Sequence, residues 1–313
     1  MATNPQGAAI NVGLTNYAKT IVQDYATILA DADFLAPRVV TGASGGTFAK
    51  FDSKQAFLSY DTERAVGGAR TKIKFAGETG SFAVKPHGLE VDLDFHELTQ
   101  YGGDETLIQQ AKTRTLLSNW ALSRFKRVFD FAITSGNFTA ASDGDAGKWT
   151  NANIDPIAKI DGIIKQVYES TGLILNRGAC DFGSWIKLRH NPTVIARQPG
   201  AQNIGVTWQQ VQNMLAAPVD FRVFNAIRGT TGFGSATTTK SAVASGTLLM
   251  WFAQPAPTQY DPSALKTFST FAGGWDSVRE YQKPDQTGTT YFLDANEDLV
   301  SVSPELLVKV SIT

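Results

Sequence analysis

The stretch from Asp104 to Ser135 contains neither proline nor glycine, and this uninterrupted length constrains the fold more than any other feature of the sequence. Asp104 is a suitable N-cap, because its carboxylate can accept hydrogen bonds from the free N–H groups of a first helical turn. Gly136 follows where a helix stop is expected. About 32 residues at ~1.5 Å each make a helix of roughly 48 Å, and a compact globule of this chain length has a diameter of about 50 Å. The sequence therefore predicts a spine helix that crosses the whole molecule.

This predicted spine helix carries apolar side chains on two sides. With successive residues about 100° apart, most of them fall on one broad stripe. The stripe consists of Leu107, Ile108, Ala111, Ala121, Leu122, Phe125, Val128, Phe129, Ala132 and Ile133. Leu116, Leu117 and Trp120 project from nearly the opposite side. A second apolar face must be buried against another segment or another subunit, and we take these three residues as candidates for inter-subunit contact.

The composition argues against several classes of protein. A net charge of −1 excludes the strong basic field that holds nucleic acid. Charged residues make up 18% of the chain, below the ~25% of ordinary soluble domains, which hints that part of the surface is covered in an assembly. No signal peptide and no run of about 18 apolar residues is visible. The single cysteine, Cys180, cannot form an internal disulfide, which fits a reducing cytoplasm.

Residues 1–47 do not read as a self-standing domain. A short amphipathic helix is predicted there, with apolar side chains on one face. They are Tyr17, Ile21, Val22, Tyr25, Ile28 and Leu29. Phe34–Pro37 ends this helix, and glycines loosen the chain after it. We interpret the segment as an arm whose apolar face, including Tyr17 and Tyr25, must lie on another surface.

Residues 48–87 have the pattern of short strands. Phe57 and Tyr60 mark an outgoing strand, and Thr71–Phe75 alternates as a half-exposed strand does. Gly77–Gly80 has turn chemistry, after which residues 81–85 return. Basic residues outnumber acidic ones, with Lys50, Lys54, Arg64, Arg70, Lys72 and Lys74 against Asp52, Asp61 and Glu63.

A two-stranded ribbon of this kind is marginal alone in water, so we expect it to lie on a neighbouring surface. Its basic excess suggests an acidic neighbour, and a solvated charged face is the alternative. The candidate contact residues of the ribbon are Phe57, Tyr60, Arg64, Arg70 and Lys72.

The remaining sequence predicts a mixed α+β protein. Gly88–Phe95 alternates strictly and leads into the spine helix. Asp155–Ala253 alternates between helices and strands as one compact α/β unit, with Asp155 capping a helix that has Pro156 in its first turn. The rest is β-rich, with strands at residues 266–271, 277–281, 289–293, 299–302 and 307–312. Asp294–Asp298 is predicted to be a turn between two of these strands.

Motifs for catalysis, metals or nucleotides are largely missing from the sequence. The three histidines, His87, His96 and His190, lack metal-ligand spacing. Asp294, Asn296 and Asp298 have the first spacings of a calcium loop but lack its glycine and its final glutamate, so a hairpin turn explains them better than a cation site. We therefore predict no enzyme, no catalytic residue, no metal site and no cofactor.

The order of these parts resembles that of the major capsid proteins of tailed bacteriophages, whose Hong Kong ninety-seven type of fold is also used by encapsulins. The most telling stretches are Gly88–Phe95 running into the spine helix, Leu248–Phe252, and the ending Asp298–Leu306. The resemblance implies an N-arm at residues 1–47 and an extended hairpin, the E-loop, at 48–87. It implies a peripheral (P) domain at 88–154 and 257–295 around the spine helix. An axial (A) domain of α/β type would occupy 155–256 and 296–313.

The resemblance also implies a function. The chain is expected to self-assemble into hexamers and pentamers of an icosahedral shell that encloses double-stranded DNA, in a virion assembled in the bacterial host's cytoplasm. Expected partners are further copies of itself, a separate scaffolding protein, a portal and a decoration protein, with no membrane. DNA contact would be weak and independent of sequence, with Lys112, Arg114, Lys126 and Arg127 as candidates. The alternatives are an encapsulin-like compartment for protein cargo and, from another class, a β-rich surface- or carbohydrate-binding protein.

Overall fold

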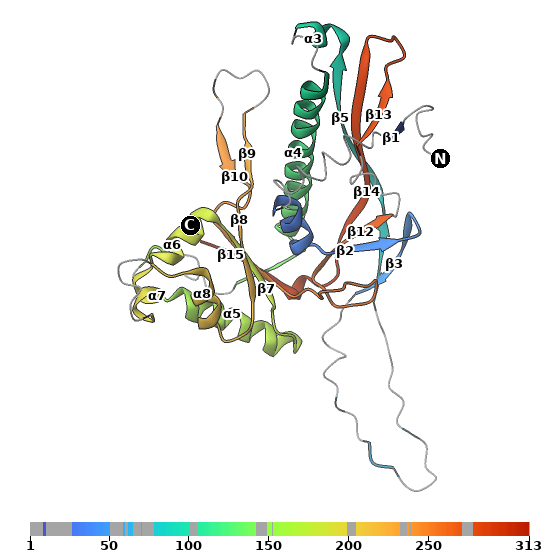
Figure 1. The fold of residues 1–313 in the computed structure, drawn as a ribbon. Helices are drawn as coiled ribbons and strands as arrows, with labels where there is room; N and C mark the ends of the chain where they lie inside the picture. Colours follow the sequence, from blue (N-terminus) through green and yellow to red (C-terminus); the bar gives the residue numbers. More distant parts are fainter. Residues whose placement is uncertain are drawn as a thin grey trace.

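Two larger sheets and a long helix dominate the molecule (Figure 1). The computed structural model describes residues 9–10, 27–50, 59, 62–64, 70, 78–100, 105–141, 149–151, 153–198, 205–231, 237, 239–270 and 278–312. The long helix stands beside the strands of the first sheet, and shorter helices flank the second (Figure 1). The fold class is α+β, as the sequence predicts.

The first sheet has six strands. Its order is β1-β13-β14-β12-β2, and β5 pairs with the opposite edge of β14. All pairs are antiparallel except β12 with β2. The strands are β1 (Ala9–Ile10), β13 (Arg279–Gln282), β14 (Gly288–Ser301), β12 (Leu265–Thr270), β2 (Arg38–Thr41) and β5 (Lys85–Asp94).

The predicted spine helix is confirmed as α4 (Glu105–Ala132), which follows the short helix α3 (Phe95–Gln100). It passes through two hydrophobic clusters. Its middle packs against the six-stranded sheet, where Trp120 joins Leu93, Tyr291 and Leu293. Its C-terminal part enters the main core through Phe125, Val128 and Phe129. Different sides of the helix thus face different parts of the same chain, which explains why the sequence has two apolar sides.

The second sheet has five strands in the order β6-β15-β11-β7-β8. Its strands are β6 (Thr139–Ala140), β15 (Leu307–Ser311), β11 (Thr247–Trp251), β7 (Arg177–Asp181) and β8 (Asp220–Phe224). The helices that accompany it are α5 (Pro156–Thr171), α6 (Phe182–Arg189), α7 (Pro192–Ala196) and α8 (Trp208–Met214). Beyond β8, the short strands β9 (Ile227–Gly229) and β10 (Lys240–Ala242) form a hairpin (Figure 1).

Helix α5 begins and ends as its sequence predicts. The Asp155 carboxylate accepts hydrogen bonds from the N–H groups of Ile157 and Ala158, and Pro156 occupies the first turn. Gly172 ends the helix in the left-handed conformation with φ 68°, which glycine adopts without steric cost. The predicted α/β unit therefore exists, with β15 from the C-terminal end of the chain completing its sheet.

The turn predicted at Asp294–Asp298 is wrong, because β14 runs through it as one strand of 14 residues. Asp294 pairs with Gly88 on β5, and a side chain at position 88 would meet the Asp294 carboxylate at 2.5 Å. Glycine at this position therefore leaves room for the Asp294 side chain while the two strands stay paired. The predicted domain boundary between residues 295 and 296 falls inside this strand, and the chain leaves the six-stranded sheet only after Ser301.

The turn predicted at Gly77–Gly80 is also displaced. Strand β4 (Thr79–Ala83) already begins within it and pairs with β3 (Gly45–Ala49) as a separate two-stranded sheet. The predicted strand Thr71–Phe75 lies outside the described residues. We call β3 and β4 together the hairpin stem, because the ribbon sequence connects these two strands.

Much of the arm predicted at residues 1–47 lies outside the described residues. Residues 27–35 form a helix, which we call the N-terminal helix. Ala32, Leu35 and Ala36 are completely buried in the main core. Strand β2 then joins the six-stranded sheet beside β12. The segment from residue 27 onward thus belongs to the body of this chain and needs no second subunit to cover it.

Candidate assembly surfaces

The hairpin stem is fastened to the six-stranded sheet by two phenylalanines. Phe48 of β3 and Phe82 of β4 are the buried side chains of their strands. Both pack on Phe268 of β12, with ring centroids 5.9 Å away for Phe48 and 4.2 Å away for Phe82, which stacks on it. The Ala83 N–H donates to the Asp298 carboxylate at 2.9 Å. The base of the ribbon is therefore held in place, and most other stem side chains face outward.

We predict that Phe82→Leu loosens the stem without unfolding the body. The change keeps an apolar side chain but removes the ring stacking on Phe268, which is worth about 0.5–1.5 kcal/mol. Amide hydrogen exchange of residues 45–49 and 79–83 should increase severalfold while exchange in α4 stays unchanged. Phe95→Leu at an exposed ring is the matched control, and equal exchange in both variants would contradict the prediction.

The residues predicted for subunit contact fall into three groups. Tyr17, Tyr25, Phe57, Tyr60 and Lys72 lie outside the described residues. Two of the ribbon arginines are described, and both are exposed, namely Arg64 and Arg70. Their contact with a neighbouring subunit stays a prediction.

The third group, in the spine helix, is a correction. Leu116, Leu117 and Trp120 are only 4%, 2% and 3% exposed within the single chain. They pack against β5 and β14, so the neighbour that covers them is this chain's own sheet. The alternative that another segment buries the second apolar face is the one that the structure supports.

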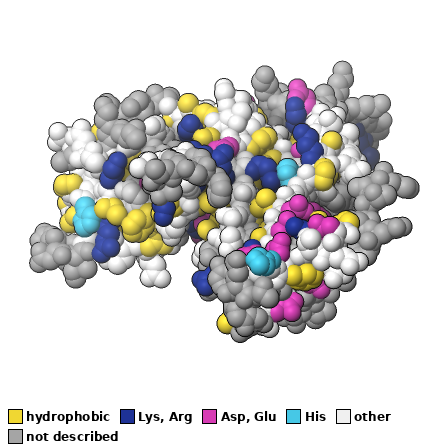
Figure 2. Space-filling view, turned by 90° about the horizontal axis from the view of Figure 1, so that it is seen from above, with side chains coloured by type: hydrophobic (Ala, Val, Ile, Leu, Met, Phe, Trp, Pro, Cys, Tyr) yellow, Lys and Arg dark blue, Asp and Glu magenta, His cyan; other side chains and the backbone are white. Residues whose placement is uncertain are grey.

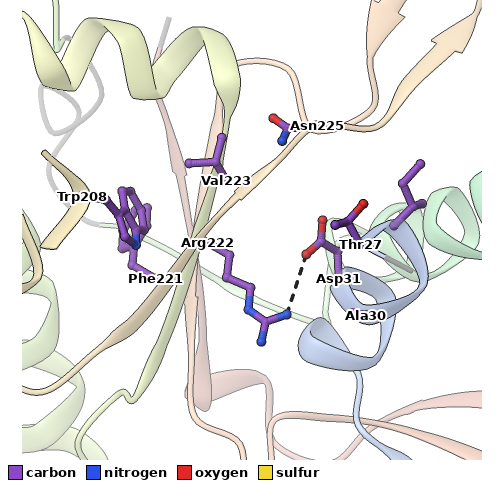
Figure 3. A pocket seen from close by; sticks show the side chains of 9 residues that line it. Thr27, Ala30, Asp31, Trp208, Phe221, Arg222, Val223 and Asn225 are labelled. Atoms are coloured by element: carbon purple, nitrogen blue, oxygen red, sulfur yellow. Dashed lines mark ion pairs between the residues drawn. The ribbon is translucent and has the colours of Figure 1, made fainter. Parts of the chain in front are cut away.

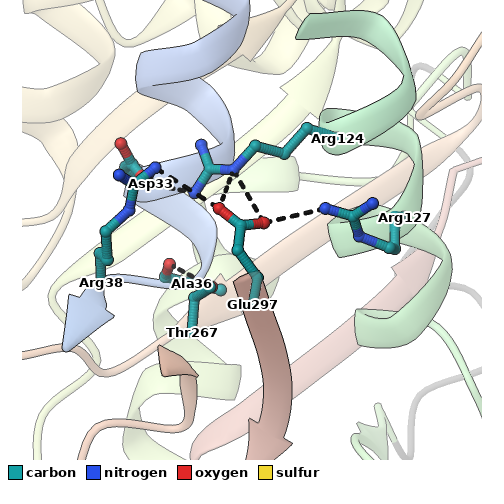
Figure 4. A network of polar contacts seen from close by, with 7 residues as sticks. All are labelled: Asp33, Ala36, Arg38, Arg124, Arg127, Thr267 and Glu297. Atoms are coloured by element: carbon teal, nitrogen blue, oxygen red, sulfur yellow. Dashed lines mark hydrogen bonds and ion pairs between the residues drawn. The ribbon is translucent and has the colours of Figure 1, made fainter. Parts of the chain in front are cut away.

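A buried charge network joins the N-terminal helix, the spine helix and β14 (Figure 4). Glu297 lies at its centre, 2% exposed, and accepts from Arg124 Nε at 2.9 Å and from Arg127 at 2.8 Å. Arg124, 1% exposed, also donates to Asp33 at 2.6 Å. Arg38 of β2 lies 3.6 Å from Glu297 and 3.8 Å from Asp33. Four separate elements thus meet in a single polar cluster.

The network keeps Glu297 ionised. Burial alone raises the pKa of a carboxyl group, but the charges of Arg124, Arg38 and Arg127 outweigh burial and hold the pKa of Glu297 below its usual range. Sequence reasoning missed this cluster because it placed Glu297 in an exposed turn. The available signal was the absence of glycine or proline between residues 289 and 301, which is unusual for a turn.

A hollow of about 410 Å³ lies between the N-terminal helix and β8 (Figure 3). Asp31 faces Arg222 across it, with their nearest charged atoms 3.9 Å apart. Trp208 and Phe221 line the same hollow and contact each other edge to face at 4.7 Å. Burial raises the pKa of Asp31 to about 7, although the nearby Arg222 opposes the shift. This carboxyl group therefore changes charge near neutral pH.

We predict that Asp31→Asn stabilises the chain most above pH 7, and that this gain in stability shrinks steadily as pH falls from about 7 to about 4. Because the pKa of Asp31 is higher in the folded chain than its ordinary 3.8, the folded state binds the extra proton, and the stability that Asp31 contributes falls as pH rises from about 4 to about 7. At pH 8 the variant should melt about 2–4 °C higher than the parent chain. Parallel melts at pH 5, 6, 7 and 8 test this, and a difference that does not change with pH would contradict it.

Most of the spine-helix cations proposed for DNA contact have acidic partners in the same chain. Lys112 lies 2.8 Å from Glu97 and Arg127 lies 2.8 Å from Glu297, while Lys126 pairs with Asp130 one turn along the helix. On the face shown in Figure 2, basic side chains lie among acidic ones. This distribution agrees with the net charge of −1 and with no more than a weak attraction for DNA.

Within the described part of the chain, no group of three His, Cys, Asp or Glu side chains is placed to hold a metal ion. Burial raises the pKa of the Cys180 thiol, and the charge of Asp181 raises it further. The thiol therefore stays protonated, which makes Cys180 a poor nucleophile. No helix in the described segments is both long enough and apolar enough to span a lipid bilayer.

Solved structures of phage and encapsulin proteins share this architecture. A phage-related protein from Bordetella bronchiseptica matches with a TM-score of 0.69 and 17% identity, over 98% of each chain. The capsid of the cyanophage P-SCSP1u matches with a TM-score of 0.54 and 11% sequence identity, over 89% of this chain and 86% of the capsid chain. The SrpI encapsulin complex from Synechococcus elongatus matches with a TM-score of 0.51 and 9% sequence identity, over 94% of this chain and 89% of the encapsulin chain. No protein-family model and no curated protein sequence matches the chain.

The chain therefore has the fold of phage capsid and encapsulin subunits. That fold is the Hong Kong ninety-seven type, and the resemblance drawn from the sequence is confirmed at the level of the fold. At these identities the likeness concerns the fold alone.

Proposed function

We propose that the chain is a major capsid protein of a tailed bacteriophage, a structural subunit with no enzymatic role. It assembles into the hexamers and pentamers of an icosahedral shell that encloses double-stranded DNA. The observation that carries this proposal is the fold likeness, which extends over nearly the whole chain and includes a capsid. The proposed location is the virion, following assembly in the cytoplasm of a bacterial host.

The hairpin stem supports an assembly role. Among the described residues, Phe48, Phe82 and the Ala83 N–H fasten the stem to the six-stranded sheet, and a two-stranded ribbon gains little stability without another surface. Residues 50–78, which connect its two strands, hold Phe57, Tyr60, Arg64, Arg70 and Lys72. We propose that this E-loop lies on a neighbouring subunit, and that a scaffolding protein, a portal and a decoration protein act as further partners.

An encapsulin-like compartment is the second candidate. The observation that favours it is the pairing of Lys112, Lys126 and Arg127 with acidic groups of the same chain, since a shell around protein cargo needs no attraction for DNA. The TM-score to the encapsulin complex, 0.51, is close to the TM-score to the cyanophage capsid, 0.54. The two candidates share a shell and differ in its content.

The test is the assembly state of the purified full-length chain. Sedimentation velocity and negative-stain microscopy should show closed shells or rings of five and six subunits. Extraction of nucleic acid and protein from nuclease-treated shells then separates a capsid from a cargo compartment. A chain that stays monomeric at high concentration across a range of salt would overturn both candidates.

A further inference from the structure

One turn of the N-terminal helix contacts both large sheets. Asp31, Asp33 and Phe34 lie within four consecutive residues, and the partners of these three side chains come from different halves of the molecule. Figure 3 shows Asp31 turned toward β8, and Figure 4 shows Asp33 turned toward α4 and β2. This short helix therefore lies between the two sheets and touches each of them.

On the side of the five-stranded sheet, two arginine side chains lie beside the Phe34 ring. The guanidinium carbon of Arg222 lies 4.0 Å from the centre of the Phe34 ring, and that of Arg177 lies 4.9 Å from it. Trp251 of β11 meets the same ring edge to face at 5.1 Å. Arg177 also donates to the Phe34 carbonyl oxygen at 2.7 Å. Three strands, β7, β8 and β11, thus bind one side chain.

On the side of the six-stranded sheet, Asp33 accepts from Arg124 at 2.6 Å and so joins the network around Glu297. The chain just after the helix is bound as well. The Thr267 hydroxyl of β12 donates to the Ala36 carbonyl at 3.1 Å, and the Thr267 N–H donates to the Pro37 carbonyl at 3.0 Å. Both sets of contacts therefore involve one short stretch of chain, the last turn of the helix and the residues that directly follow it.

We propose that the N-terminal helix is a wedge whose docking couples the two sheets, so that loosening its contacts with one sheet also loosens its contacts with the other. The physical reason is that Asp33 and Phe34 are adjacent. A displacement of the helix that separates Phe34 from its arginines also moves Asp33 away from Arg124. Coupling of this kind is reciprocal, because the contacts with each sheet favour the same docked position of the helix.

The coupling has a consequence for the segment before residue 27, which continues directly into the wedge. A partner that pulls on this segment changes the docking of the helix and hence the freedom of the sheets to move against each other. This consequence for subunits in a shell rests on the proposed function. The coupling itself is a property of the single chain and can be measured without a shell.

The experiment is hydrogen exchange of the unassembled full-length chain with two variants. Phe34→Leu removes the ring beside Arg177 and Arg222, and it should raise exchange around Arg124 and Glu297, which belong to the contacts on the other side of the helix. Asp33→Asn removes the other anchor, and it should raise exchange in β8 around Arg222. Coupling free energies between sites typically correspond to roughly five- to 150-fold changes, and we expect changes within this range.

Phe138→Leu is the matched control, since Phe138 meets Lys309 of β15 at 5.0 Å, whereas Phe34 of the wedge contacts β7, β8 and β11. It should leave exchange around Arg124 and Glu297 unchanged. If Phe34→Leu does not fold, Asp33→Asn still decides the question, because Asp33 is partly exposed and its loss is milder. The proposal would be overturned if Phe34→Leu raised hydrogen exchange only in the five-stranded sheet and Asp33→Asn raised it only around Arg124 and Glu297. This outcome does not depend on what the chain assembles into.

Discussion

Glu297→Gln is expected to lower the free energy of unfolding by about 3–5 kcal/mol, because removing one partner of a buried ion pair leaves the other charge uncompensated. Most of this loss comes from Arg124, whose buried positive charge would no longer face the Glu297 carboxylate; Arg124 is 1% exposed and donates to Glu297 at 2.9 Å. Urea denaturation of the unassembled chain measures the loss. The difference should narrow as pH falls through the lowered pKa of Glu297, because the parent chain then also loses the carboxylate.

Glu90→Gln is the control for this change. Glu90 is exposed on β5, so the same charge is removed from a neighbouring strand without uncovering a buried partner. The double variant Arg124→Met with Glu297→Gln should recover part of the lost stability, since the buried cation is then gone as well. A loss below about 1 kcal/mol for Glu297→Gln, the range of an exposed ion pair, would show that the network contributes little.

Trp120→Ala is expected to destabilise the unassembled chain by about 3–5 kcal/mol, the usual cost of truncating a large aromatic side chain in a core. Trp120 is 3% exposed and packs with Leu116 and Leu117 against the six-stranded sheet. The result separates a core role from the inter-subunit role predicted from the sequence. If Trp120 has a core role, the variant lowers the urea concentration at which dissociated subunits unfold, before any assembly takes place.

Leu107→Ala provides the comparison on the same helix. Leu107 is 62% exposed, so its truncation should change stability by less than about 0.5 kcal/mol. If Trp120→Ala left the isolated subunit as stable as Leu107→Ala does and impaired only shell formation, Trp120 would belong to an interface after all.

The parts of the fold that were predictable from sequence are those set by local rules. The spine helix follows from a long stretch without glycine or proline, and α5 follows from its Asp155 cap and Gly172 stop. The alternation of Gly88–Phe95 likewise predicts β5. In these segments the chemistry of neighbouring residues decides the structure, so no distant contact is needed to anticipate it.

The parts that were mispredicted depend on contacts between distant segments. Asp294–Asp298 has the composition of a turn, but pairing with β5 on one edge and β12 on the other keeps it extended. Arg124 and Glu297 are 173 residues apart in sequence, so nothing local indicates that they meet. The two apolar sides of the spine helix were visible, but the sequence could not decide which surface covers the second.

The continuity of β14 has a mechanical consequence. The strand leaves the six-stranded sheet at Ser301 and the chain reaches β15 of the five-stranded sheet at Leu307. Tension between the two sheets therefore pulls on β14 along its length. The ladder of an antiparallel pair lies across the strand, so the ten residue pairs with β5 are loaded together in shear instead of opening one after another. A subunit built in this way is expected to resist a pull along β14 better than a pull that peels β14 away from β5.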